Sequence, residues 1–310
     1  MAIRVGPYAG PEMLTGPWER RRKLLQRVTD SGLDHVFVAD HVSFHTGFGM
    51  DGLIQAATLA AMEPTLTVQV GVYLLALRHP MVAARQIATF SESAPGRLVL
   101  GIGVGGEDRH EIEVCGVDPA TRGRRTDAAL EILRGVLTGE PYSHHGDHFD
   151  LDDALILPAP DPPVPIVVGG RSEAALTRAA RFGDGWLGVW STPERYGRTV
   201  ARVEEEAERL GRRVDGWRHG LQNWVGVDED RNRARARLAK VMQDVYRLPF
   251  DRFERFSPCG TPEQIAAELA PLVALGCGDF NIQAIAASTE ASIEAVARIK
   301  QVLVEDAAAA

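Results

Sequence analysis

The 310-residue chain is 45% hydrophobic and 25% charged, which is typical of a soluble globular protein with one large domain or two small ones. Its net charge of −8 gives no electrostatic reason to expect binding to nucleic acid or to an anionic membrane. The N-terminal sequence lacks the apolar core of a signal peptide, and no stretch approaches the ~20 apolar residues of a membrane span, so we expect a soluble, cytoplasmic protein. Cys115, Cys259 and Cys277 are odd in number and far apart, which argues against a disulfide framework and for packing roles.

Eight short runs rich in β-branched residues recur along the chain, each followed by turn residues and then by an apolar pattern of helical period. The runs begin near residues 2, 35, 66, 97, 164, 185, 221 and 279. The helical patterns cover residues 17–31, 51–62, 80–94, 119–138, 172–182, 193–210, 230–246, 261–275 and 289–303, the last of which precedes a frayed alanine-rich tail. Eight such units over this length predict a TIM (β/α)8 barrel better than a doubly wound sheet.

Two intervals interrupt this rhythm. Residues 138–165 contain turn residues, a hairpin-like segment at 149–157 and a proline cluster, so we expect an excursion between the fourth and fifth strands at the barrel mouth. The second interval covers residues 247–258. No low-complexity linker separates two halves, which predicts a single domain over residues 1–310.

Residues 101–106 read GIGVGG and match G-x-G-x-x-G directly after a strand. A dinucleotide-binding fingerprint should open the first strand-helix turn and be followed, about 20 residues later, by an acidic residue that ends a second strand. Residues 121–127 instead belong to a predicted helix, which disfavours a nicotinamide site. Glycine here still suits a backbone that a flat or anionic group approaches closely.

A second glycine cluster lies at residues 167–175, where Gly169 and Gly170 end a strand and Ser172 can cap the next helix. Unpaired backbone N–H groups at such a turn can hold a phosphate. An ordinary strand-helix turn explains the same residues equally well.

Asp40 and His41 end the second strand and place an acid and an imidazole at the predicted catalytic face. A histidine there can exchange protons near neutral pH, although a structural histidine that caps the loop is the alternative. His45, His79 and His110 also fall in loops on that side.

The segment HHGDH at residues 144–148, with Asp150 nearby, contains residue types that bind transition metals. It lies in the excursion and lacks a helical pair of ligands, so we interpret it as a solvated turn and expect no metal. The chain has no G-x-S-x-G elbow and no cysteine nucleophile with an evident histidine partner.

Together these residues resemble the luciferase-like flavin and deazaflavin oxidoreductases along nearly the whole chain. The matching stretches are VFVADH, RHPMVAARQIATFSESAPGRLVLGIGVGG, CGVDPATRGRRTDAALEILRGVLTGEP, ILPAPDPPVPIVVGGRSEAALTRAARFGDGW and GTPEQIAAELAPLVALG. The resemblance implies a TIM barrel with a large excursion, a homodimer, and a flavin-type ring at the C-terminal mouth.

The resemblance also implies a cofactor and its binding residues. The branch that uses coenzyme F-420, a deazaflavin, shows an Asp-His pair after the second strand, as this chain does, whereas relatives that use FMN more often have Glu-His. A non-prolyl cis peptide behind the ring would map to the third strand. The implied cofactor-binding residues are Asp40, Tyr73 and Leu74 (the cis peptide), Gly103, Val104, Gly105 and Gly106 (the ring), and Gly169, Gly170, Arg171 and Ser172 (the phosphate).

A deazaflavin passes hydride in two-electron steps, so the protein must place the substrate on the ring and supply a proton donor or acceptor. We expect His41 to take that role, with Glu107 as the second candidate. Deazaflavin-dependent glucose-6-phosphate dehydrogenases resemble this pattern but have Glu where this chain has Gly106, and Trp where it has His45. These departures argue against glucose 6-phosphate as the substrate.

Three hypotheses for the function follow. The first is an F-420-dependent oxidoreductase acting on a small organic substrate. The second is a two-component monooxygenase that uses FMN, and the third is a non-catalytic barrel that binds a flavin-like ligand or a partner. The loops at 42–49 and 143–157, which combine His, Phe and Asp, suggest a partly apolar pocket with protonable walls.

Overall fold

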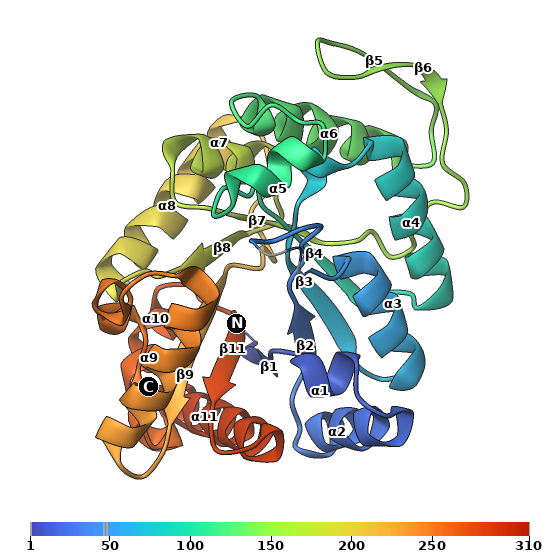
Figure 1. The fold of residues 1–310 in the computed structure, drawn as a ribbon. Helices are drawn as coiled ribbons and strands as arrows, with labels where there is room; N and C mark the ends of the chain where they lie inside the picture. Colours follow the sequence, from blue (N-terminus) through green and yellow to red (C-terminus); the bar gives the residue numbers. More distant parts are fainter. Residues whose placement is uncertain (1, 46, 48, 310) are drawn as a thin grey trace. The chain divides into compact units, whose positions relative to one another are not determined.

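The computed structural model describes residues 2–45, 47 and 49–309 (Figure 1). These residues divide into two compact units. The first unit combines the N-terminal segment up to Phe37 with the segment from Gly185 onward, and the second runs from Val38 to Asp184. All eight predicted strands are present and begin within two residues of the expected positions. The assignment of a single domain stays a prediction.

The first unit contains a parallel sheet in the order β1, β11, β9, β8, with the short β10 paired to β9. Its strands are β1 (Arg4–Pro7), β8 (Trp186–Val189), β9 (Gly220–Val227), β10 (Cys259–Gly260) and β11 (Asp279–Ile285), together with the first three residues of β2 (His35–Val38), whose last residue belongs to the second unit. Its helices are α1 (Pro11–Leu14), α2 (Trp18–Asp30), α8 (Pro193–Arg209), α9 (Arg231–Tyr246), α10 (Pro262–Ala274) and α11 (Thr289–Ala309), with 3-10 turns η2 (Phe250–Arg252) and η3 (Glu254–Phe256) in the second interruption.

The second unit contains a parallel sheet in the order β3, β4, β7. Its strands are β3 (Thr67–Tyr73), β4 (Leu98–Ile102) and β7 (Ile166–Gly169), together with an antiparallel hairpin of β5 (Tyr142–His145) and β6 (Asp150–Ala154). Its helices are α3 (Gly52–Met62), α4 (Pro80–Ser93), α5 (Arg109–Val114), α6 (Arg122–Val136) and α7 (Glu173–Phe182), with the 3-10 turn η1 (Leu75–Leu77).

The strands are short and apolar because parallel strands are covered by helices on their faces. All four residues of β2 and all five of β4 are buried. The helices begin at residues that suit helix starts, since Asp51, Thr192 and Ser172 accept hydrogen bonds from backbone N–H groups in the first turns of α3, α8 and α7. Local sequence therefore sets the strand-helix rhythm.

The structure differs from the sequence predictions in several details. The helix α5 was not predicted, because one and a half turns are too short to show a helical period. The alanine-rich tail does not fray after Leu303 but continues α11 to Ala309, in keeping with the high helix propensity of alanine. The hairpin in the excursion pairs Tyr142 with Ala154 and His145 with Asp150, so its first strand precedes the segment predicted as hairpin-like.

The cysteines are free thiols, and Cys259 and Cys277 are buried as packing residues. Within the described residues, no helix combines the length and the apolar character needed to cross a membrane.

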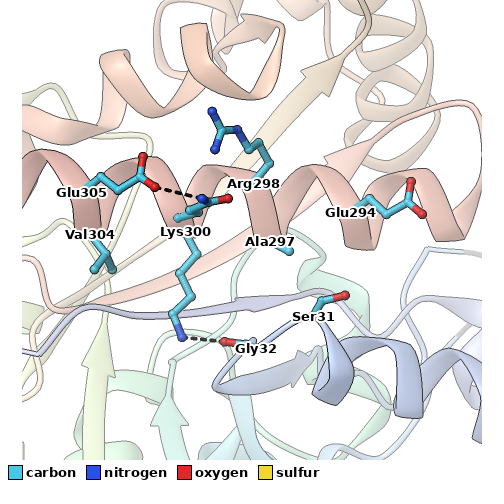
Figure 2. A pocket seen from close by; sticks show the side chains of 9 residues that line it. Ser31, Gly32, Glu294, Ala297, Arg298, Lys300, Val304 and Glu305 are labelled. Atoms are coloured by element: carbon cyan, nitrogen blue, oxygen red, sulfur yellow. Dashed lines mark hydrogen bonds between the residues drawn. The ribbon is translucent and has the colours of Figure 1, made fainter.

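A groove of about 660 Å³ runs beside α11 and the loop that follows α2 (Figure 2). Its polar side chains pair within the protein: the Lys300 ammonium donates to the Gly32 carbonyl at 2.7 Å, and the Gln301 amide donates to the Glu305 carboxylate at 2.8 Å. We therefore interpret this groove as a surface feature of the first unit and assign it no chemistry.

His219 should make the first unit sensitive to acid. It is 3% exposed, its Nδ1 accepts a hydrogen bond from the Trp186 backbone N–H at 3.1 Å, and its Nε2 lies 3.2 Å from the Glu204 carboxylate. Burial lowers the pKa of His219 from 6.5 to about 4. Because the unfolded chain then binds the proton more readily than the folded chain, this group should cost about 3 kcal/mol of stability as the pH falls from 6.5 to 4.

The check is urea denaturation at several pH values. His219→Asn keeps an acceptor for the Trp186 N–H but does not titrate, so its stability should fall less over this pH range than that of the parent protein. His110→Asn, at an exposed position, is the matched control and should follow the parent. Equal acid sensitivity in His219→Asn and the parent would contradict the prediction.

Candidate active site

Two glycines at the end of β4 allow a close approach of β3. A Cβ atom at residue 101 would lie 2.4 Å from the Val70 carbonyl oxygen, and one at residue 103 would lie 2.3 Å from Cγ2 of Val72. The register of the two strands shifts between Val70 and Tyr73. Gly101 and Gly103 are therefore required by an irregularity in the neighbouring strand.

This irregularity contains a cis peptide bond between Gly71 and Val72. The family resemblance implied a non-prolyl cis bond in this strand, at Tyr73 and Leu74. The cis bond is present in the strand, but that position was wrong. Gly101 and Gly103 have no side chains, and the space where their Cβ atoms would stand is taken by residues 70 and 72, not by residue 74. The irregularity of β3 therefore lies before Tyr73.

Gly101→Ala should destabilise the protein by about 1–3 kcal/mol, because the new methyl group would meet a backbone carbonyl that cannot rotate away. Gly123→Ala in α6 is the matched control, since its Cβ would meet only the Arg178 guanidinium at 3.5 Å, an ordinary contact. Urea denaturation of both variants checks this. A Gly101→Ala protein as stable as the control would show that β3 moves freely at this point.

Asp40 is 1% exposed, and its carboxylate accepts four hydrogen bonds. Oδ1 accepts from the Gly52 N–H at 2.8 Å and from Nη2 of Arg78 at 2.7 Å, while Oδ2 accepts from the Leu74 N–H at 2.8 Å and from Nη1 of Arg78 at 2.7 Å. Burial raises the pKa of Asp40 above its usual value, and Arg78 with the two amides acts against this rise. All four hydrogen bonds come from donors of three residues, so the Asp40 side chain joins the end of β2 to α3 and to the end of β3.

Tyr73 and Leu74 are buried beside this ion pair. The Arg78 guanidinium lies over the Tyr73 ring, 4.3 Å from its centroid, and Tyr73 is fully buried. Burial raises the pKa of Tyr73, and its hydroxyl has no hydrogen-bond partner among the described residues. Leu74 is 5% exposed, and its side chain lies 3.5 Å from the position of a Cβ at Gly105. The Leu74 side chain therefore packs beside the glycine loop, and the Tyr73 carbonyl accepts a hydrogen bond from the Gly103 N–H at 3.1 Å.

His41 forms a pair with Glu111, which is 3% exposed and lies in α5. Nδ1 of His41 lies 3.1 Å from Oε2 and 3.3 Å from Oε1 of Glu111. Oε1 also accepts hydrogen bonds from the backbone N–H groups of Val42 at 2.7 Å and Ser43 at 3.1 Å. The His41 side chain is 28% exposed, so the imidazole is held on one edge and open on the other.

The loop after β2 is fixed by a second acidic residue at the start of α5. Asp108 caps α5 by accepting from the His110 N–H at 3.0 Å, and it also accepts from the His45 N–H at 2.6 Å. The pKa of Asp108 lies below its usual value, because hydrogen bonds from backbone N–H groups lower it by more than burial raises it. The Phe44 ring lies between the rings of His41 and His45, with centroids 4.2 and 4.0 Å away.

Sequence reasoning missed Glu111 and chose Glu107, which is exposed in the loop before α5. The available signal was D-x-x-E at Asp108 to Glu111, the spacing of a helix cap followed by an acidic residue at the third helical position. That signal predicts a local capping role for Glu111, whereas the fold turns its carboxylate toward His41.

The glycine loop after β4 meets an arginine. Gly105 and Gly106 have φ values of 68° and 132°, which favour glycine. Val104, which precedes them, is half-buried. A Cβ at residue 106 would lie 3.6 Å from Nε and Nη2 of Arg122. Nε of Arg122 is buried without a hydrogen-bond partner in the described part of the chain. The loop thus presents bare backbone beside a cation.

The second glycine cluster forms the start of α7. Gly170 has a φ of 124°, and the Ser172 hydroxyl accepts from the Ala175 N–H at 3.2 Å. Arg171 and Ser172 are exposed, and Gly169 is half-buried. The geometry is that of a capped helix start, and phosphate binding there stays a prediction.

Two further histidines have local partners. His79 caps α4 by accepting from the Met81 N–H at 3.3 Å, and His145 in the hairpin pairs with Asp150 at 2.6 Å. Among the described residues, no group of three or more His, Cys, Asp or Glu side chains is placed to hold a metal ion.

Comparisons with known proteins show relatives of the chain. The F-420-dependent glucose-6-phosphate dehydrogenase of Nakamurella multipartita is 30% identical over 240 residues, which cover 75% of this chain and 70% of the relative. Uncharacterised mycobacterial proteins are 35% identical over 163 residues, and this match spans 56% of their length.

Two solved structures share the fold. An F-420-dependent secondary alcohol dehydrogenase in complex with an F-420-acetone adduct superposes with a TM-score of 0.85 at 20% identity, covering 98% of this chain and 99% of that one. The oxygenating constituent of 3,6-diketocamphane monooxygenase from Pseudomonas putida, in complex with FMN, gives a TM-score of 0.76 at 18% identity, covering 98% and 99%. These likenesses confirm the TIM (β/α)8 barrel.

The model of one protein family, described as luciferase-like monooxygenase, matches residues 2–278. This match covers most of the chain, and the relative that is 30% identical agrees with it. The chain therefore belongs to the luciferase-like monooxygenase family.

Proposed function

We propose that the chain is an oxidoreductase that transfers a hydride between coenzyme F-420, a deazaflavin, and a small organic substrate, with His41 as the proton donor or acceptor. The observation that carries this proposal is the His41 imidazole, held at Nδ1 by the buried Glu111 and 28% exposed. An imidazole fixed on one edge and accessible on the other suits general acid–base work. The named relatives that use F-420 support the same cofactor.

The glycine loop fits a cofactor of this kind. Gly105 and Gly106 leave the backbone uncovered, and any side chain at 106 would enter the space beside Arg122. The buried Nε of Arg122 offers a donor and positive charge to a polar or anionic edge. We assign Gly103 to Gly106 to the ring and Gly169 to Ser172 to the phosphate.

When bound, the deazaflavin would supply hydride chemistry in two-electron steps. The chain's own groups would do the rest. His41 would exchange the substrate proton at its Nε2 atom. Asp40 and Arg78 would hold the ends of β2 and β3 in place, and Phe44 would shield one face of the imidazole. Glu107 stays a second candidate for proton exchange.

Titration of the purified protein with oxidised F-420 and with FMN tests the cofactor. We expect saturable binding of the deazaflavin and weaker binding of FMN. Tight FMN binding with no affinity for the deazaflavin would replace our proposal with the two-component monooxygenase, which the FMN complex among the structural neighbours supports. Binding of neither would favour the non-catalytic barrel.

The substrate and assembly are also proposals. A panel of small alcohols and carbonyl compounds, followed by the absorbance of the deazaflavin, tests the substrate class. We expect a homodimer, and light scattering after size-exclusion chromatography measures it.

A further inference from the structure

We infer that Glu111 is a positioning residue that fixes the tautomer of His41, keeping the ring proton on Nδ1 and leaving Nε2 as the atom that exchanges protons with the substrate. This inference rests on the proposed function of His41 but concerns a group that the sequence patterns did not identify. It follows from the set of donors around one carboxylate.

The contacts of Glu111 are made by donors. Oε1 accepts from two consecutive backbone N–H groups, those of Val42 and Ser43, and Oε2 faces Nδ1 of His41 at 3.1 Å. A carboxylate is an acceptor-only group at neutral pH, so the nitrogen that faces it must carry the hydrogen. The neutral imidazole then has its lone pair on Nε2.

The surroundings hold this geometry in place. Glu111 is 3% exposed, so water does not compete for its oxygens, and the same carboxylate fixes the backbone on which the imidazole is mounted. Asp108 ties the next part of the loop to the first turn of α5. Nε2 of His41 has no hydrogen-bond partner among the described residues, which leaves it available to a ligand.

The assignment gives each atom a place in the reaction. In the oxidation direction, a bound deazaflavin would supply the acceptor for the hydride, with its two electrons, of a substrate carbon, and Nε2 of His41 would accept the proton of the attached hydroxyl. The substrate thereby loses two electrons and two hydrogens and becomes a carbonyl compound. In the reverse direction, the same proton returns from Nε2.

Glu111→Gln separates this role from simple anchoring of the loop. The glutamine carbonyl oxygen can still accept from the Val42 and Ser43 N–H groups, so anchoring survives. Its amide nitrogen, however, would face Nδ1 as a donor. The imidazole should therefore switch to the tautomer with the proton on Nε2, which cannot accept the substrate proton.

The test is ¹⁵N NMR of the histidine rings in the full-length protein without cofactor. The signals of His41 are identified by their loss in His41→Asn. We expect the Nδ1–H tautomer in the parent and the Nε2–H tautomer in Glu111→Gln, with an unchanged melting temperature. Glu113→Gln, in the same helix but paired at the surface with Arg109, is the matched control and should keep the parent tautomer.

An Nε2–H tautomer in the parent protein, or an unchanged tautomer in Glu111→Gln, would overturn the inference. If Glu111→Gln fails to fold, the tautomer of the parent alone decides. The readout does not depend on the cofactor. A tautomer that switches as expected in a protein with no affinity for the deazaflavin would support the positioning role and reject the proposed function.

Discussion

Replacing His41 with alanine should lower the rate of hydride transfer to or from the deazaflavin by about 10²- to 10⁴-fold, the usual contribution of a positioned general acid or base. Affinity for the cofactor should change little, because the proposed contacts with the ring and the phosphate come from the glycine loop and the start of α7. The measurement is a single-turnover absorbance trace of the bound deazaflavin, together with a cofactor titration.

His110→Ala is the matched control, since His110 is exposed on the neighbouring helix α5 and should leave the rate unchanged. His41→Ala should also cost about 1–3 kcal/mol of stability, because it removes one donor from the buried Glu111 carboxylate, so the rate is compared in protein shown to be folded. An unchanged rate in His41→Ala would remove His41 from the proton transfer, whatever the cofactor proves to be.

The second large effect concerns stability. Arg78→Met should cost about 3–5 kcal/mol, because it leaves the Asp40 carboxylate buried without its charged partner. The side chain of Asp40 is fully buried, and that of Arg78 is 14% exposed, so solvent cannot replace the lost guanidinium. Two backbone donors, the N–H groups of Gly52 and Leu74, would remain and would not neutralise the charge.

Urea denaturation of Arg78→Met and of the double variant Asp40→Asn/Arg78→Met measures this effect. Removing the charge on both partners should recover part of the loss, since the unpaired charge and not the missing contact is the main cost. Arg85→Met, at a surface position of α4 whose guanidinium donates to the Leu157 carbonyl, is the control. A loss below about 1 kcal/mol in Arg78→Met would mean that water reaches Asp40.

The sequence predicted the strands and helices well because their signals are local. The run at β2, for example, is buried at all four residues, three of them apolar, because parallel strands are covered on both faces. The signals for helix starts are equally local. Ser172, for example, caps α7 by accepting a hydrogen bond from the N–H of Ala175, only three residues later. Where the local signal was short, as in α5, the prediction failed.

Asp40, His41 and the glycines after β4 were identified as site residues from their position after strands, and their roles toward a cofactor stay predictions. The structure adds contacts that the sequence did not indicate: Asp40 accepts hydrogen bonds from Arg78 and two backbone amides, and Gly101 and Gly103 lie against residues 70 and 72 of β3. A sequence does not show which backbone atoms will face a given glycine.

What the sequence by itself determined is the order of strands and helices, the family, and the two segments where polar residues gather. Only the tertiary structure decided which carboxylate meets His41. Glu111 lies 70 residues from His41 in the chain, and no local rule connects them. Glu111 lies in α5, after β4, and His41 follows β2, and the fold of the second unit brings these two segments into contact. There the buried Glu111 carboxylate must find hydrogen-bond donors, because an unpaired buried charge is costly.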